Sequence, residues 1–329
     1  MRSPPINPTI DLLTSYIIAS VQRSGTHLLC SLLRSTGVAG WPDEHFFLHF
    51  FSKPCETREG RWVSPLPLAY VEGVLRQFTS PNGVFGTVVM WSYFERMLQM
   101  LQEIPAYKNL RGVELLAEVL HQPRYIWLRR RNRVEQAVSW AIACQTGVWA
   151  QKAGEKARPR IVPKFDFKVI DELLNRIEAH ETGWAKYFRD NHIDPLVLFY
   201  EDVVACNRGS AEHVLEFLGL PAATATEIAP SAFEKQANQI SQQWMEAYFE
   251  QKGEPQAHRT NVLESLARGE AGRGLAGWWV WPYARGGFET FLLGRGSRCQ
   301  GGAKWHTWLA SALLSMLKVN TTSTHPALR

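Results

Sequence analysis

The chain has 329 residues, of which 45% are hydrophobic and 20% charged, and its formal net charge is +5. These proportions are ordinary for a globular protein and provide enough apolar side chains for a sizeable core. The positive charge suits an anionic ligand, a nucleic acid or an acidic surface, without choosing among them. No run of about 18 apolar residues and no secretory leader is recognisable, so we expect no integral membrane segment and a cytoplasmic location. The five cysteines are scattered without a CxxC pair, so we expect neither a metal site nor a disulfide framework.

Four apolar runs bounded by turn residues predict β-strands at residues 16–21, 84–91, 125–128 and 196–200. Segments with helical periodicity lie between them and predict helices at residues 26–36, 92–104, 112–120, 133–144, 167–188 and 208–218. Because strands alternate with helices, we expect an α/β fold in which a central parallel β-sheet is flanked by helices. This domain should span residues 15–252, between an N-terminal arm (1–14) and an irregular extension rich in Gly, Arg and Trp (253–329).

The loop after the first strand carries side chains that suit an anion. It consists of Gln22, Arg23, Ser24, Gly25, Thr26 and His27. A loop between a strand and a helix N-terminus presents free N–H groups and the positive end of the helix dipole. Gly25 lets a ligand approach the backbone, and Arg23 adds a planar charge that matches phosphate oxygens. The loop lacks the first Gly and the Lys of the GxxxxGK[ST] pattern, which disfavours an ordinary ATPase or GTPase. On the loop alone, a capped core helix is an equal interpretation.

A second strand leads into a helix through three successive arginines, Arg129, Arg130 and Arg131. Ser139 follows Arg131 by eight positions (139 − 131), or about two helical turns, so both could meet a second phosphate. The alternative is a solvated basic run at a strand end. Since three successive side chains cannot all point one way, we expect at least one of these arginines to be a surface charge.

In this order, the segments resemble sulfotransferases that use 3′-phosphoadenosine 5′-phosphosulfate (PAPS), above all the bacterial trehalose 2-sulfotransferase family. The resemblance runs from Ser15 to Gln251 and is carried by SYIIASVQRSGTHLLCSLLRSTGVAGWPDEHFF, NGVFGTVVMW, RVEQAVSWAIACQTGVW, ETGWAKYF and FEKQANQISQQWMEAY. It implies a P-loop-like sulfotransferase fold, PAPS as donor, 3′,5′-ADP as product and no metal. It places the 5′-phosphosulfate on the loop at residues 22–27 and the 3′-phosphate on Arg131 and Ser139, with Lys235 and Gln236 near the latter.

The resemblance also assigns the acceptor side. It aligns Glu44 with a carboxylate proposed as general base. The alternatives are that Glu44 is a plain surface carboxylate and that His45 is the base. Trp41, His45 and Phe46 are expected to contact the acceptor, a carbohydrate or glycolipid hydroxyl, although aromatic residues at this density more often belong to the core. Arg23 would be catalytic, because charge grows on the bridging oxygen of the departing 3′,5′-ADP.

Three positions depart from the family pattern. Trp41 stands where a sugar-contacting acid is expected, Val88 replaces a Lys, and His27 replaces a small hydroxyl residue. A non-catalytic nucleotide-binding protein on the same frame is therefore the alternative function. Tyr200 and Trp149 are candidates to stack on adenine, and a core role is the alternative for each. We expect no nucleic-acid partner, because interleaved aromatic and basic residues are lacking. The resemblance allows a homodimer, because homodimers occur in that family.

Overall fold

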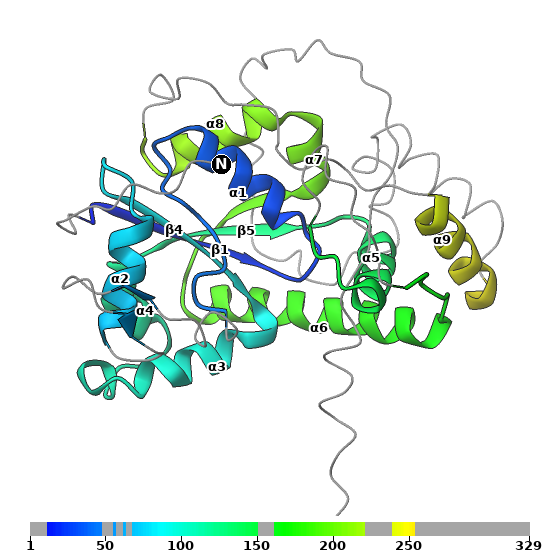
Figure 1. The fold of residues 1–329 in the computed structure, drawn as a ribbon, viewed down its shortest axis with the longest axis horizontal. Coiled ribbons are helices and arrows are strands. Elements are labelled where there is room, and N and C mark those ends of the chain that lie inside the picture. Colours follow the sequence, from blue (N-terminus) through cyan, green and yellow to red (C-terminus); the bar gives the residue numbers. More distant parts are fainter. Residues whose placement is uncertain are drawn as a thin grey trace, which may run out of the picture.

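The computed structural model describes residues 12–47, 55–56, 62–63, 68–150, 161–220 and 239–253. Its centre is a parallel four-stranded sheet with the strand order β4-β1-β5-β6 (Figure 1). The strands are β1 (Thr14–Ser20), β4 (Val84–Met90), β5 (Arg124–Arg129) and β6 (Leu196–Phe199). All four predicted strands are present, and the expected α/β fold with a central parallel sheet is confirmed.

Helices cover both faces of this sheet. Figure 1 shows α1, α7 and α8 on one side and α3 and α6 on the other. The helices are α1 (Thr26–Ser35), α2 (Leu68–Phe78), α3 (Trp91–Gln102), α4 (Gly112–Leu120), α5 (Arg133–Thr146), α6 (Phe167–Asp190), α7 (Tyr200–Ala205), α8 (Asn207–Phe217) and α9 (Gln239–Lys252). A 3-10 turn (Pro105–Tyr107) and a small hairpin of β2 (Cys55–Glu56) and β3 (Trp62–Val63) complete the elements. The six predicted helices are present, whereas α2, α7, α9 and the hairpin were not predicted.

The first strand lies in the middle of the sheet and is buried on both faces. Its residues from Ser15 to Ser20 are all buried, which explains the uninterrupted apolar run in the sequence. After β1 the chain pairs β4 on one side, and then crosses to pair β5 on the other. Ligands of open α/β sheets bind outside the carboxyl ends of the strands at such a reversal. The loops after β1 and β5, which carry the two predicted anion motifs, leave the sheet at this carboxyl edge.

Aromatic side chains join α6 to the sheet and to α3. Trp184 on α6 donates its indole N–H to the carbonyl of Ser20 over 2.9 Å, at the end of β1. Its ring packs against Trp91 and Phe94 of α3, with centroid distances of 5.2 and 4.8 Å. Trp91 lies directly on Gly183, where an added Cβ would come within 2.1 Å of the indole. This contact fixes the start of α3 beneath the carboxyl edge.

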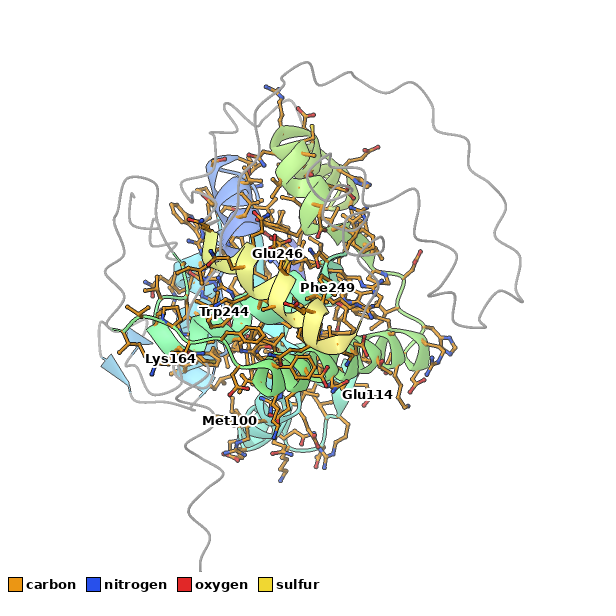
Figure 2. The ribbon with its side chains drawn as sticks, turned by 90° about the vertical axis from the view of Figure 1, so that its right-hand side faces the viewer. Met100, Glu114, Lys164, Trp244, Glu246 and Phe249 are labelled. Atoms are coloured by element: carbon orange, nitrogen blue, oxygen red, sulfur yellow. The ribbon has the colours of Figure 1, made fainter. Side chains whose placement is uncertain are left out.

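The helix α9 packs across α5 at the end of the molecule shown in Figure 2. Trp244 contacts Phe165 at 5.8 Å, and Tyr248 stacks on Phe167 at 5.0 Å. The Tyr248 hydroxyl donates to Asp171 over 2.6 Å. Among the described residues, no helix combines the length and apolar character needed to cross a membrane. The predicted extension after Gly253 and most of the N-terminal arm lie outside the described residues.

The Trp91 contact yields a test of the α3–α6 packing. Glycine to alanine inside a helix normally stabilises by about 1 kcal/mol, but overpacking costs about 1–3 kcal/mol. We expect Gly183→Ala to lower the free energy of unfolding, measured by urea denaturation. Gly209→Ala in α8 is the matched control, since its Cβ would meet only the small side chain of Cys206, with Sγ at 2.9 Å and Cβ at 3.9 Å. Equal stability of the two variants would contradict the close approach of Trp91.

Candidate active site

The loop between β1 and α1 contains two residues with positive φ angles. Arg23 has φ of +68° and Gly25 has φ of +87°. Left-handed backbone is strained for a residue such as Arg23 and easy for glycine. No side chain caps the N-terminus of α1. In the part of the chain that the structure describes, the amides of Gly25 and Thr26 donate to no protein acceptor. These amides and the helix dipole make the loop a site for an anion.

The helix α5 holds this loop in place through Gln136. The Gln136 side-chain amide donates to the carbonyl of Gln22 over 2.7 Å and to the hydroxyl of Ser24 over 3.1 Å. Ser24 in turn donates to the carbonyl of Val21 over 2.8 Å, and it is fully buried. The Ser24 hydroxyl therefore shapes the loop and has no proton left for a ligand, whereas the sequence suggested that it would bind the anion.

Arg23 joins the two anion motifs. Its Nε donates to Oγ of Ser139 over 2.9 Å, and its Nη1 donates to the carbonyl of Trp149. Burial and, secondly, the charge of Arg130 lower the pKa of Arg23 to about 10, so the side chain stays cationic at neutral pH. Both acceptors are neutral. Within the described residues Arg23 forms no ion pair, and its charge remains available to a ligand.

Tyr200 forms the wall beside Gly25. A Cβ on Gly25 would lie 2.3 Å from Cδ2 of Tyr200, so only glycine fits there. The buried guanidinium of Arg130 lies 4.6 Å from the centroid of the same ring and pairs with Glu135 at 2.7 Å. Nη1 of Arg130 also donates to the carbonyl of Arg23 over 3.4 Å. Tyr200 and Arg130 thus contact the strained backbone at Gly25 and Arg23 and hold it in place.

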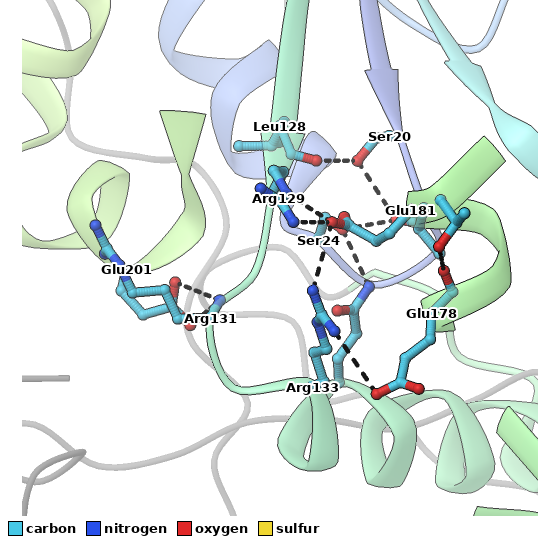
Figure 3. A network of polar contacts seen from close by, with 12 residues as sticks. Ser20, Ser24, Leu128, Arg129, Arg131, Arg133, Glu178, Glu181 and Glu201 are labelled. Atoms are coloured by element: carbon cyan, nitrogen blue, oxygen red, sulfur yellow. Dashed lines mark hydrogen bonds and ion pairs between the residues drawn. The ribbon is translucent and has the colours of Figure 1, made fainter. Parts of the chain in front are cut away.

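Each of the three successive arginines reaches a different carboxylate. Arg129 pairs with Glu181 on α6 at 2.5 Å, and Arg130 pairs with Glu135 on α5. Arg131 makes a bidentate pair with Asp202 on α7, at 2.8 and 2.6 Å. Figure 3 shows Arg129 and Arg133 converging on Glu181, while Arg131 lies apart beside Glu201. Arg130 is buried, whereas Arg131 pairs with Asp202 at an exposed position, so the three side chains point in different directions.

The structure does not bring Arg131 and Ser139 into contact. Asp202 holds the Arg131 guanidinium, which also lies 4.2 Å from the centroid of Phe199. The amide of Arg131 donates to Glu201 over 3.1 Å. Ser139 instead accepts from Arg23. Of the predicted pair for the 3′-phosphate, Ser139 faces the loop and Arg131 is engaged by an acid.

The segment after α1 is fastened to β4 through Asp43. Its carbonyl accepts from the amide of Val88 over 2.9 Å and from the hydroxyl of Thr87 over 3.2 Å. Its carboxylate pairs with Arg34 of α1 at 2.6 Å and accepts from the amide of Glu44 over 2.9 Å. These contacts of Asp43 therefore hold the backbone at Glu44 against the sheet.

The carboxyl group of Glu44 has a pKa close to neutral pH. It is half-buried, and burial and the neighbouring charge of Asp43 raise its pKa to about 7. The hydroxyl of Tyr93 donates to Oε2 of Glu44 over 3.3 Å, which opposes this rise in pKa. A carboxylate poised near neutral pH is suited to accepting a proton.

Comparison with known proteins agrees with this geometry. Residues 15–251 match the family model described as Stf0 sulphotransferase. The chain belongs to the Stf0 sulphotransferase family. Two relatives are both named trehalose 2-sulfotransferase. The protein of Mycobacterium tuberculosis (strain ATCC 35801 / TMC 107 / Erdman) is 28% identical over 256 residues, covering 71% of this chain and 93% of the relative. That of Mycolicibacterium smegmatis (strain ATCC 700084 / mc(2)155) is 30% identical over 260 residues, covering 71% and 94%. The resemblance drawn from the sequence is confirmed.

Two residues that the sequence assigned to the acceptor lie in the core of this sulphotransferase. His45 stacks on Phe78 with centroids 4.0 Å apart, and its Nε2 contacts the carbonyl of Trp41 at 2.9 Å. Burial lowers the pKa of His45 to about 4, so its ring is neutral. Phe46 is 1% exposed. Burial opposes an acceptor role for His45 and Phe46 and leaves Glu44 as the candidate base, with Trp41 half-buried beside it.

The remaining assignments fall elsewhere. His27 is exposed on the first turn of α1, and Trp149 is 40% exposed. Lys235 and Gln236 lie outside the described residues. Across the described ranges, no three His, Cys, Asp or Glu residues are grouped so that they could hold a metal.

Sequence reasoning missed Gln136 and Tyr93. Gln136 was detectable, because it is a polar residue among the mostly apolar buried residues of α5, three positions before Ser139. Tyr93 had no such signal, since a tyrosine among aromatic residues reads as core.

The role of Gln136 in holding the loop between β1 and α1 can be tested by substitution. Gln136→Leu leaves two buried acceptors without their donor, which should cost about 1–3 kcal/mol of unfolding free energy. It should also speed amide exchange in the loop. Gln145→Leu is the matched control on the same helix, because Gln145 makes two hydrogen bonds to Lys164 at the surface. Unchanged exchange at the amides of Ser24, which donates to Val21, and of Leu28, which donates to Gly25, would refute this role of Gln136.

Proposed function

We propose that this protein transfers a sulfuryl group from PAPS to a hydroxyl of a carbohydrate or glycolipid, in line and without a metal, with Glu44 as base. One observation supports this most. Arg23, a cation without a carboxylate partner among the described residues, lies at an uncapped helix N-terminus and contacts the second anion motif through Ser139.

The chemistry of this edge fits a phosphosulfate. The Arg23 guanidinium and the amides of Gly25 and Thr26 donate hydrogen bonds and accept none, as an anion requires. Bound PAPS would supply the sulfuryl group and a phosphate leaving group. Arg23 and the loop amides would stabilise the charge that grows on the departing oxygen. Ser139 accepts from Arg23 but keeps its own proton, which it can donate to a phosphate oxygen.

The acceptor side fits a hydroxyl group. Asp43, the neighbour of Glu44, pairs with Arg34 of α1 at 2.6 Å, so the segment that carries Glu44 lies against this helix. The N-terminus of the same helix would bind the donor. Trp41 offers a flat apolar surface on which a sugar ring could pack. Because both relatives are named trehalose 2-sulfotransferase, trehalose is the first acceptor to test.

The role of Glu44 predicts a defined loss of activity. Glu44→Gln should slow sulfuryl transfer by about 10²–10⁴-fold, because general-base catalysis contributes that much. Wild-type activity should fall as the pH drops through 7, where Glu44 takes up a proton, and Glu44→Gln should lose this acid limb. Transfer from ³⁵S-labelled PAPS to trehalose and a panel of sugars and glycolipids measures both.

Glu114→Gln, on the exposed side of α4, serves as the control. Full activity of Glu44→Gln would eliminate Glu44 as base. If the wild type bound 3′,5′-ADP and sulfated no acceptor, the alternative of a non-catalytic nucleotide-binding protein would be favoured.

The pair between Arg131 and Asp202 predicts two opposite effects on 3′,5′-ADP binding. Arg131→Ala should weaken binding by about tenfold or more, as expected for a charge-assisted hydrogen bond. Asp202→Asn should strengthen binding by up to about fivefold, because it frees the guanidinium from an exposed ion pair. Calorimetry with and without Mg²⁺ measures both, and Mg²⁺ should have no effect.

Asp190→Asn removes the acid of another exposed pair, with Lys186, and should leave binding unchanged. Equal affinity of Arg131→Ala and wild type would exclude Arg131 from the nucleotide site.

We place residues 15–252 in one catalytic domain, flanked by the arm (1–14) and the extension (253–329). A cytoplasmic location is supported by the thiols of Cys30 and Cys144, which form no disulfide in the part of the chain that the structure describes.

A further inference from the structure

The first turn of α3 contacts both halves of the candidate site through two consecutive residues. Ser92 accepts a hydrogen bond from the side-chain amide of Gln22, which belongs to the donor loop. The next residue, Tyr93, donates its hydroxyl to Glu44 over 3.3 Å. The two contacts therefore link the anion loop and the candidate base through one rigid peptide.

The position of the first turn of α3 is set by the strand β4 of the sheet. The strand β4 ends at Met90 and α3 begins at Trp91, so no loop separates them. Trp91 is held on Gly183 of α6, and Tyr93 is 4% exposed with its ring 5.2 Å from that of Phe47. The side chains of Ser92 and Tyr93 consequently project from a backbone that cannot easily shift.

The Tyr93 hydroxyl has two acceptors and one proton. Besides Glu44, the carbonyl of Val88 lies 3.2 Å from it. A hydrogen bond to an ionised carboxylate is stronger than one to a neutral carbonyl. The proton of Tyr93 therefore favours Glu44 when that carboxylate is charged, and Val88 when Glu44 is protonated.

We propose that Tyr93 is a positioning residue for the carboxylate of Glu44 and Ser92 a positioning residue for the donor loop, so that the start of α3 aligns the base with the anion site. This inference rests on the proposed function. It adds to that function two residues that act through Glu44 and Gln22 and do not touch the reacting atoms.

The charged and titratable groups around Glu44 allow opposite tests. Asp43 and His45 flank it in its own segment, Cys30 and Arg34 face this segment from α1, and Tyr93 reaches it from α3. Asp43 raises the pKa of Glu44 and Tyr93 lowers it. Loss of the phenol should therefore raise this pKa, and loss of the Asp43 charge should lower it.

The decisive experiment titrates Glu44 without donor or acceptor. Side-chain carboxyl signals of ¹³C-glutamate-labelled protein are followed by NMR, and the Glu44 signal is assigned by its absence in Glu44→Gln. In Tyr93→Phe the pKa of Glu44 should rise by about half a unit to one unit, and in Asp43→Asn it should fall. The pH at which the sulfation rate falls on the acid side should shift up in Tyr93→Phe and down in Asp43→Asn, as the pKa of Glu44 does.

Tyr187→Phe is the matched control. It removes another partly buried phenol, which contacts the hydroxyl of Tyr125 at 3.2 Å on the same side of the sheet. This variant should leave the titration of Glu44 unmoved. Ser92→Ala should raise the KM for PAPS by about fivefold without moving the acid limb, since it removes one hydrogen bond to the donor loop.

A Glu44 pKa that is unchanged in Tyr93→Phe would overturn the inference, as would a KM for PAPS unchanged in Ser92→Ala. If Tyr93→Phe fails to fold, the contact between Tyr93 and Glu44 is tested in the wild type, by following the ¹³Cζ chemical shift of Tyr93 as the pH is changed. It should titrate with the midpoint of Glu44 and be flat in Glu44→Gln, and a flat wild-type curve would refute the contact. Because neither titration needs sulfuryl transfer, an inactive protein with these titrations would refute the proposed function alone.

Discussion

The candidate site depends on one buried side-chain amide, that of Gln136, which bonds two points of the loop between β1 and α1. A loop with two left-handed residues is strained unless its surroundings hold it. Gln136 holds Gln22 and Ser24, while the adjacent turn of α5 offers Ser139 to Arg23. The same helix thus fixes the loop conformation and supplies part of the second anion motif, so that the two motifs are positioned by one rigid element.

Charge pairing explains how this edge can carry many arginines and still bind an anion. Arg129, Arg130, Arg131 and Arg133 each pair with a carboxylate. These pairs neutralise most of the positive charge, and Arg23 remains with neutral acceptors only in the described part of the chain. A charge in a region of low dielectric constant attracts a nearby ion more strongly than the same charge in water. The arrangement concentrates attraction at the loop instead of spreading it over the surface.

Much of the fold was predictable because its signals are local. The continuous apolar runs of β1 and β4 and the apolar stripe of α6 follow directly from burial on one or both faces. The loop after β1 was likewise recognisable, since glycine and hydroxyl residues between a strand and a helix have few other uses. Partners distant in sequence were not predictable. His45 reads as a base in DEHFF, and only its stacking on Phe78 shows that it belongs to the core. Arg131 reads as a phosphate ligand, and Asp202, 71 positions later, holds it instead.

The direct passage of β4 into α3 has a consequence for how this site can vary. With no connecting residues between Met90 and Trp91, an insertion of one amino acid there cannot be absorbed by a loop. Each added residue turns the following helix by about 100°. The hydroxyls of Ser92 and Tyr93 would then point away from Gln22 and Glu44 together. Length changes at this junction should therefore be far less tolerated than changes of side chain, so variation in the candidate site must come from other segments.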